Sequence, residues 1–277
     1  IKNASVNVYA IDVRPNDEAV DATFGVYASS AYVRISSVNV DAGGSPANKI
    51  TRAGIVVSSW SVVSYASVTV QSAHGIWLAG SSMTSVSYST ALNNGTPFYA
   101  VYLQDASSSS FSMSFASNTA GYGVVLENGS SNVVSRSSIA TGNAWSALYL
   151  DASSSNTITR SYLNGGIGDG AYFWIDSNWN VISHSTMTST AGNKYGLFIR
   201  ASSNTNSDSF IYNSGDTALE IWTEPGNLVM DSTVTSLGTG YSPALNIVSA
   251  TSSTITRCYV SNPNSIGLSL DSAEYTS

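Results

Sequence analysis

The chain has little positive charge and almost no cysteine. Only 10 of its 277 residues are Lys or Arg, against 17 Asp or Glu, which leaves a formal net charge of −7. The basic residues do not cluster, so we expect neither a nucleic-acid partner nor attraction to an anionic membrane. Cys258 is the single cysteine, which excludes an intramolecular disulfide framework.

Long apolar runs are also absent, since no stretch reaches transmembrane length and no signal peptide can be recognised. We therefore expect no membrane insertion. The sequence begins at Ile1 without Met and stops at Ser277 within a repeat, which predicts a mature or excised segment of a longer polypeptide. Only 10% of residues are charged although 43% are hydrophobic. Ser, Thr, Asn and Gly supply the polarity, which favours an extracellular or cell-surface protein, or a periplasmic one, over a cytosolic enzyme.

A short block repeats along the sequence, with a small residue followed by an apolar, a variable and a second apolar residue. Clear copies begin at Gly75, Gly123, Ala147 and Gly196, and the series starts more weakly at Gly25. Successive copies are about 24 residues apart. Alternation within each block predicts a strand whose second and fourth residues point inward and whose third points outward. This spacing leaves room for three short strands per turn.

A second column lies about thirteen residues into each coil, where Ser recurs before an apolar residue. Examples are Ser137, Ser161, Ser185 and Ser209, and Cys258 occupies the equivalent place near the end of the chain. Stacked coils would bring these hydroxyl groups into one column, where they can satisfy each other and nearby backbone groups. We interpret Cys258 as a structural member of this column.

The linking segments, such as Ala152-Ser153-Ser154-Ser155-Asn156-Thr157-Ile158, resemble the generic parallel β-helix repeat of carbohydrate-binding and sugar-hydrolysing solenoid proteins. The resemblance implies an all-β fold, a right-handed single-stranded parallel β-helix with three sheets and about eleven coils. Residues 25–277 would form this β-helix, truncated at its C-terminus. Residues 1–24 fit the period poorly and would form an irregular coil or a partial N-terminal cap.

The outward position of the repeated block carries an aromatic stripe. Its aromatic members, which we predict to contact a ligand or partner, are Tyr27, Trp77, Tyr102, Tyr149, Phe173 and Phe198. Tyr99, Tyr122 and Tyr195, each just before a strand, would widen it. Aligned aromatic rings suit stacking on sugars and equally suit burial against another protein. Simple cross-strand stacking is the structural alternative.

Four carboxylates follow these strands on successive coils, namely Asp105, Glu127, Asp151 and Asp176. Two acids one coil apart would match the ~5 Å separation of a retaining glycosidase, so Glu127 and Asp151 are the candidate catalytic pair. The four could also bind Ca²⁺. However, the Asn-Thr-Asp, Asp-Asp and Gly-His-Gly blocks of polygalacturonase-like hydrolases are absent. The basic residue that pectate-lyase-like enzymes place over an acidic calcium cluster does not accompany these acids either.

The residue before the serine column varies in charge. In order it is Arg136, Arg160, His184, Asp208, Asp231 and Arg257, which we interpret as solvated turn residues rather than an acid–base constellation. His74 has no acidic neighbour in its own coil and receives no role.

Together these features predict an extracellular structural or adhesive β-solenoid that contacts a polysaccharide or cell-surface glycan, or a second protein, with self-association as one possibility. The alternative is a polysaccharide lyase or glycoside hydrolase acting beside the aromatic stripe. Because no complete catalytic motif is present, the sequence favours the non-enzymatic function, and it requires no cofactor.

Overall fold

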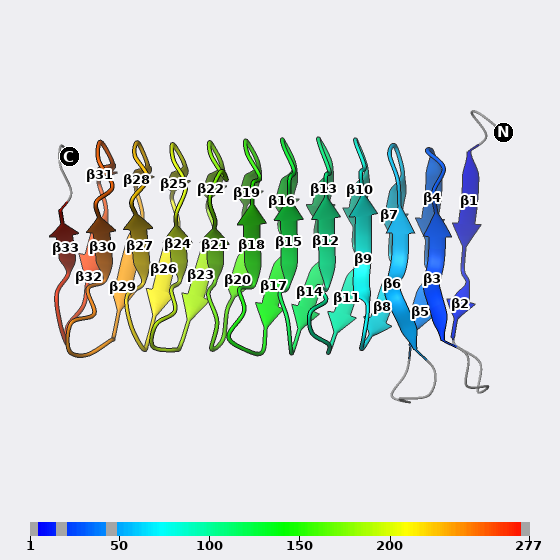
Figure 1. Cartoon of the computed structure of the whole chain (residues 1–277), viewed down its shortest axis with the longest axis horizontal. Coiled ribbons are helices and arrows are strands. Elements are labelled where there is room, and N and C mark those ends of the chain that lie inside the picture. Colours follow the sequence, from blue (N-terminus) through cyan, green and yellow to red (C-terminus); the bar gives the residue numbers. More distant parts are fainter. Residues whose placement is uncertain (1–4, 15–20, 43–48, 273–277) are drawn as a thin grey trace.

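A computed structural model describes residues 5–14, 21–42 and 49–272. These residues form three parallel sheets of eleven strands each, and each sheet takes every third strand of the chain. Figure 1 shows the resulting solenoid with its coils in sequence order from one end to the other. No helix in the described ranges is long and apolar enough to cross a membrane.

The strands of the three sheets have the following bounds. Sheet A contains β1 (Val6–Tyr9), β4 (Val33–Ser36), β7 (Val62–Ser64), β10 (Ser85–Ser87), β13 (Ser110–Ser112), β16 (Val133–Ser135), β19 (Thr157–Thr159), β22 (Val181–Ser183), β25 (Thr205–Ser207), β28 (Leu228–Met230) and β31 (Thr254–Thr256). Sheet B contains β2 (Asp12–Val13), β5 (Asn39–Asp41), β8 (Ser67–Val70), β11 (Thr90–Asn93), β14 (Phe115–Asn118), β17 (Ser138–Thr141), β20 (Tyr162–Asn164), β23 (Thr186–Ser189), β26 (Phe210–Asn213), β29 (Thr233–Ser236) and β32 (Tyr259–Ser261). Sheet C contains β3 (Ala22–Ala28), β6 (Ile50–Val57), β9 (His74–Ala79), β12 (Val101–Gln104), β15 (Val124–Glu127), β18 (Leu148–Asp151), β21 (Ala171–Phe173), β24 (Leu197–Ile199), β27 (Leu219–Trp222), β30 (Leu245–Val248) and β33 (Leu268–Asp271).

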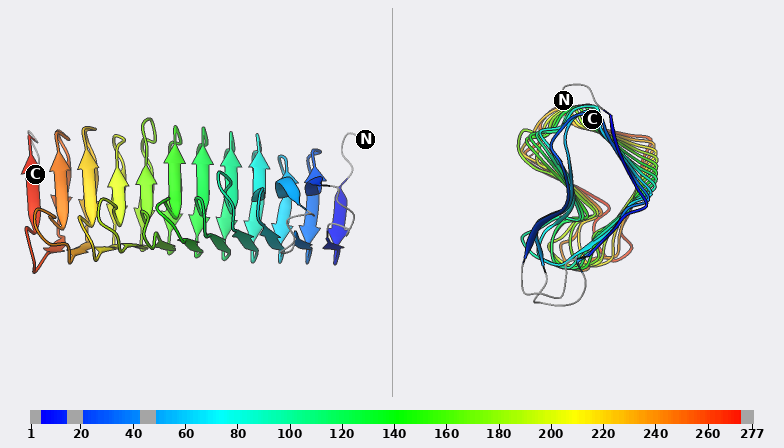
Figure 2. Two further views of the ribbon diagram at one scale, coloured as in Figure 1. Left: turned by 60° about the horizontal axis from the view of Figure 1, so that its bottom comes forward. Right: turned by 90° about the vertical axis from the view of Figure 1, so that its right-hand side faces the viewer.

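The interior is one continuous apolar column, because the coils superimpose when viewed along the solenoid axis (Figure 2). Leu148, Leu150, Ile158 and Leu163 come from the three sheets of two successive coils, and all four are 0% exposed. Tyr149 lies on the outer side and is only partly buried. The predicted fold and the inward register of these four residues are therefore confirmed, and the coil length of about 24 residues agrees with the sequence period.

The N-terminal segment takes part in the same stacking. β1 pairs with β4, and β2 pairs with β5, both in parallel. The described residues of the predicted irregular coil or partial cap thus supply the first strands of sheets A and B. The division of the chain at residue 25 stays a prediction.

The serine column is a hydrogen-bonded ladder at the corner between sheets A and B. The Ser161 N–H donates to Ser185 Oγ at 3.2 Å, and the Ser185 N–H donates to Ser209 Oγ at the same distance. Each hydroxyl in turn donates within its own coil, as Ser185 does to the Ser183 carbonyl at 2.8 Å. Cys258 continues the ladder, with its thiol 3.3 Å from the Thr256 carbonyl. The column therefore satisfies corner backbone groups that the sheets leave unpaired.

A second ladder, which the sequence analysis did not identify, lies at the corner between sheets C and A. The Asn156 N–H donates to Asn180 Oδ1 at 2.8 Å, and the Asn180 N–H donates to Asn204 Oδ1 at 2.8 Å. The Asn180 amide also donates to the carbonyls of Ser153 and Ser177, at 2.9 and 2.7 Å. Each Asn is buried and bridges consecutive coils, so this ladder fixes the coil register.

The residues before the serine column lie in tight turns. Arg136, Arg160 and His184 are exposed and have positive φ values of 50°, 50° and 51°. Only two residues join sheets A and B in each coil, and the left-handed residue turns the chain from one sheet into the next. The interpretation of this column as solvated turn residues is therefore confirmed.

We predict that Asn180→Ala destabilises the protein by at least about 2 kcal/mol, because it leaves the buried Asn156 N–H without its acceptor and removes two donors to corner carbonyls. Arg160→Ser, in an exposed turn, should change stability by no more than about 0.5 kcal/mol. Urea unfolding followed by circular dichroism measures both. Equal effects of the two substitutions would contradict the ladder's role.

Candidate functional site

The outer side of sheet C carries the aromatic column that the sequence predicts, with one correction. Parallel pairing aligns Tyr27, Val56, Trp77, Tyr102, Val125, Tyr149, Tyr172, Phe198, Glu220, Asn246 and Ser269. The prediction of Phe173 as an outward residue is wrong, because Phe173 pairs with Leu150 and is 1% exposed in the core. Gly170, not Ala171, is the small residue before this strand, which shifts the block by one position. Tyr172 therefore takes the outward place.

A second row of rings lies directly before the strands. Tyr122 stacks on Tyr149 with ring centroids 4.8 Å apart, and Tyr195 lies 4.8 Å from Phe198. Tyr99 meets Tyr102 edge-to-face at 4.9 Å. The expectation that these three tyrosines widen the stripe is confirmed. We call the two rows together the aromatic face.

Ring packing buries part of the aromatic face. Tyr102 is 6% exposed and Phe198 is 2% exposed, so neighbouring rings already cover these two predicted contact residues. Tyr27 is 60% exposed, whereas Trp77 and Tyr149 are partly exposed. A ligand can therefore reach the face at separate places along the axis rather than along its whole length.

One such place is a cavity of about 370 Å³ over the middle coils. It is lined by Tyr122, Ala144, Trp145, Ser146, Tyr149, Asp169, Tyr172, Trp174 and Lys194. We call it the central cavity. Its volume falls within the usual range of small-molecule sites, and a few polar groups converge in it among aromatic walls. Trp145 is 46% exposed and comes from the loop between β17 and β18.

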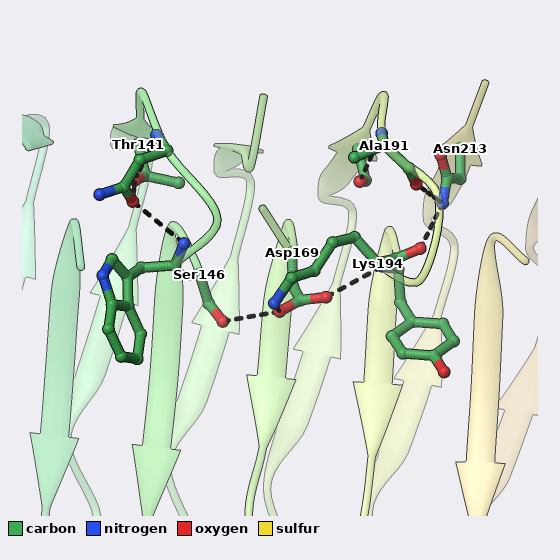
Figure 3. Close-up of polar contacts among 10 residues, drawn as sticks. Thr141, Ser146, Asp169, Ala191, Lys194 and Asn213 are labelled. Carbon is green, nitrogen blue, oxygen red and sulfur yellow. Dashed lines mark hydrogen bonds and ion pairs between the residues drawn. The ribbon is translucent and has the colours of Figure 1, made fainter. Parts of the chain in front are cut away.

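Asp169 is the buried polar centre of this cavity. Its carboxylate accepts from the Lys194 ammonium at 3.2 Å, from the Ser146 hydroxyl at 3.1 Å and from the Tyr195 N–H at 2.9 Å. Figure 3 shows Asp169 between Ser146 and Lys194, which come from different coils. Burial raises the pKa of Asp169, and the Lys194 charge opposes that shift. The side chain of Lys194 keeps 28% of its surface exposed, so it can also donate to a ligand.

The four predicted carboxylates do not form one row. Glu127 pairs in register with Asp151 on the outer side of sheet C, so this candidate pair is adjacent. Asp105 and Asp176 are exposed turn residues with φ values of 50° and 61°. Within the described ranges, no group of three or more His, Cys, Asp or Glu residues is placed to hold a metal ion. The structure thus does not assemble the predicted calcium cluster.

Glu127 and Asp151 follow the outer row of the aromatic face, and neither takes part in an ion pair among the described residues. Burial raises the pKa of Glu127, and the Asp151 charge raises it further. Burial also raises the pKa of Asp151, with a smaller contribution from Asp176. The Tyr102 hydroxyl donates to the Glu127 carboxylate. Both acids thus hold protons more tightly than free side chains do, as expected for candidate proton donors.

His74, to which the sequence analysis gave no role, lies within a ring cluster beside this face. Its ring centroid is 4.9 Å from those of both Tyr99 and Tyr102 and 5.3 Å from that of Phe98. Its Nδ1 accepts from the Tyr99 N–H at 3.2 Å. Burial, followed by the charge of Arg52, lowers the pKa of His74 to about 4. His74 is therefore neutral at pH 7.

Sequence reasoning missed Trp145, Asp169, Trp174 and Lys194, which line the central cavity. One signal was present for Asp169, which directly precedes the small residue Gly170 just as Tyr122 precedes Gly123. The other three positions depend on loop conformation and on the corrected register.

Similarity to solved structures defines the class of protein, a right-handed parallel β-helix. An alginate lyase from Paenibacillus sp. shares 12% identity at a TM-score of 0.60, covering 90% of this chain and 99% of that one. The A-module of a mannuronan C-5 epimerase from Azotobacter vinelandii shares 10% identity at a TM-score of 0.64, covering 96% and 80%. A DFA-IIIase from Arthrobacter chlorophenolicus, in complex with DFA-III, shares 10% identity at a TM-score of 0.67, covering 96% and 83%.

Family models give the more particular assignment. The model described as periplasmic copper-binding protein (NosD) matches residues 8–183, and the chain belongs to this family. A model of right-handed β-helix regions matches residues 146–276. The sequence matches none of the curated proteins.

The residues of this chain do not fit the copper ion in the family's description. Copper in proteins is held mainly by His, Cys and Met side chains. The sequence has two His, one Cys and four Met, all within the described ranges. His74 begins β9, His184 follows β22 and Cys258 precedes β32, so the three strongest donors lie on separate coils. The donor set is therefore dispersed rather than assembled.

The low pKa of His74 generates a prediction about stability. A free histidine titrates near 6.5, so acidification from about pH 6.5 to 4 protonates the unfolded chain before the folded one. His74 should thus cost up to about 3 kcal/mol of stability across that window. His74→Gln should flatten this loss, measured as urea unfolding at several pH values. Identical pH profiles for the two proteins would show that His74 is not held neutral.

Proposed function

We propose that this protein is a carbohydrate-binding β-helix of the periplasm or cell surface that holds a polysaccharide along the aromatic face. The central cavity is the observation that carries the proposal. It combines Tyr122, Tyr149 and Tyr172 with the buried Asp169–Lys194 pair. Aromatic rings stack on the apolar faces of sugars, and a carboxylate beside an ammonium can accept from and donate to neighbouring sugar hydroxyls.

The shape of the face supports a polymeric ligand. The cavity opens on a surface that continues along the axis, with adjacent coils ~4.8 Å apart. An extended chain could therefore lie parallel to the axis and contact several coils. The family's description as periplasmic and the alginate-acting structural relatives support the proposed location and ligand class. Adhesion to a cell-surface glycan is the corresponding biological activity, and a second copy of this chain is the other partner that the sequence predicts.

Trp145→Ala should weaken polysaccharide binding by roughly tenfold, because it removes an exposed ring from the cavity wall. The fold should persist, since Trp145 lies in a loop. Trp179→Ala is the matched control, because Trp179 is 63% exposed and lines no part of the cavity. Glycan arrays followed by calorimetry measure affinity, and sedimentation reports any change in assembly. Wild-type affinity and assembly in Trp145→Ala would refute the central cavity as the contact.

A polysaccharide hydrolase or lyase is the second candidate function, which the Glu127–Asp151 pair favours. Their Cα atoms are partners on adjacent parallel strands. Carboxyl groups one coil apart match the ~5 Å separation of retaining glycosidases. The raised pKa of each acid suits a group that must donate a proton.

Under this alternative, the protein should release new reducing ends, or unsaturated sugar ends in the case of a lyase, from a polysaccharide that it binds. Asp151→Asn should lower that rate at least about 100-fold while leaving binding in place. Asp105→Asn is the control. Asp105 is an exposed acid that is not aligned with Glu127 or Asp151 in the strand pairing. Binding without any product would exclude the enzyme and leave the binding function standing.

A further inference from the structure

A second cavity opens on the same face over the first three coils. Its volume is about 270 Å³, and its lining comes from Phe24, Tyr27, Ala28, Ser29, Arg52, Val56, Val57, Ser58, Trp77 and Ala79. We call it the N-terminal cavity. It shares no lining residue with the central cavity, and Phe98, Tyr99 and Tyr102, on the coil between the two linings, belong to neither. It is therefore a distinct place for a ligand.

Arg52 supplies the charge of the N-terminal cavity. Its guanidinium lies over the Trp77 ring, 5.2 Å from the centroid. The ion pairs found in the described part of the chain are Arg14–Asp12, Lys194–Asp169 and Arg257–Asp231, so no carboxylate there pairs with Arg52. An arginine presents five N–H donors in a planar fork, which matches a carboxylate with two parallel hydrogen bonds.

The remaining lining suits a sugar ring beside such a carboxylate. Tyr27 is 60% exposed and is braced by Phe24, whose ring stacks on it at 4.7 Å. Ser58 Oγ and Trp77 Nε1 are buried and have no hydrogen-bond partner among the described residues. Buried polar groups normally have partners, so these two atoms remain available to a ligand hydroxyl or to a water that bridges to it.

We propose that the N-terminal cavity binds an acidic sugar unit, with its ring on Tyr27 and its carboxylate on Arg52. This inference rests on the proposed polysaccharide-binding function and specifies the chemistry of the ligand. A uronic-acid unit provides both parts, namely an apolar ring face and a planar carboxylate attached to it.

The charges of the central cavity restrict the ligand further. Asp151 ends β18 two residues after the lining residue Tyr149, and Glu127 is its partner on β15, while Lys194 is already paired with Asp169. A chain with a carboxylate on every unit would be repelled there, whereas neutral units would not. The N-terminal cavity thus has in its lining one cation that pairs with no described carboxylate, and no acid, whereas the carboxylates of Glu127 and Asp151 lie further along, where Arg200 is occupied over the Trp174 ring. A polysaccharide that mixes acidic and neutral units fits this order, and the order gives the bound chain one direction along the axis.

Binding of hyaluronan oligosaccharides, which alternate uronate and neutral units, tests the proposal by calorimetry. Carboxyl-reduced hyaluronan oligosaccharides and oligogalacturonate are the comparison ligands. We expect the acidic alternating ligand to bind at least about tenfold more tightly than its carboxyl-reduced form. It should also bind more tightly than oligogalacturonate. Arg52→Gln should abolish the preference over the reduced form.

Arg34→Gln is the matched control, because Arg34 is an exposed arginine of β4 on sheet A and lines neither cavity. It should keep the preference of the wild type. Equal affinity for the acidic and reduced ligands, or equal effects of the two arginine substitutions, would overturn the acidic-unit proposal. Tighter binding of oligogalacturonate would overturn the mixed-chain assignment. A different result would refute the proposed function itself, namely that Trp145→Ala binds every neutral glycan as the wild type does.

Discussion

Parallel pairing of each coil with the next is the constraint on which the rest of this structure depends. It places residues about 24 positions apart in the sequence beside one another, so one side chain type repeated at that spacing becomes a continuous row. Rows that face inward become the core, and rows at corners become ladders. The row that faces outward on sheet C becomes the aromatic face. The core, the corner ladders and the candidate site therefore all follow from the same register of pairing between successive coils.

The ladders and the core stabilise that register in different ways. Burial of Leu148 or Leu150 is favourable but not directional, because an apolar side chain tolerates some displacement along the axis. The Asn180 amide requires its partners at hydrogen-bonding distance and orientation. Apolar packing therefore supplies much of the free energy of folding, and the corner hydrogen bonds define the position of each coil relative to its neighbours.

The sequence was sufficient to predict the fold, the inward residues and most of the aromatic column, since these depend only on period and alternation. The register failed at Phe173 because Gly170 and Ala171 are both small, and alternation alone could not choose between them. The cavities were not predictable. Trp145 and Lys194 lie in connections between sheets B and C, and the shape of such loops is not encoded by the repeat. That no described carboxylate pairs with Arg52 likewise depends on which side chains neighbouring coils bring near it.

The connections between strands differ in how freely they can change. Sheets A and B are always joined by two residues, whereas the connections from sheet B to sheet C vary in length and supply walls of the central cavity. Insertions and deletions in these longer loops leave both corner ladders in register. Ligand preference can therefore diverge among homologues through loop length alone, with little loss of the ability to fold. Duplication of a whole coil would lengthen the binding face without creating a new architecture.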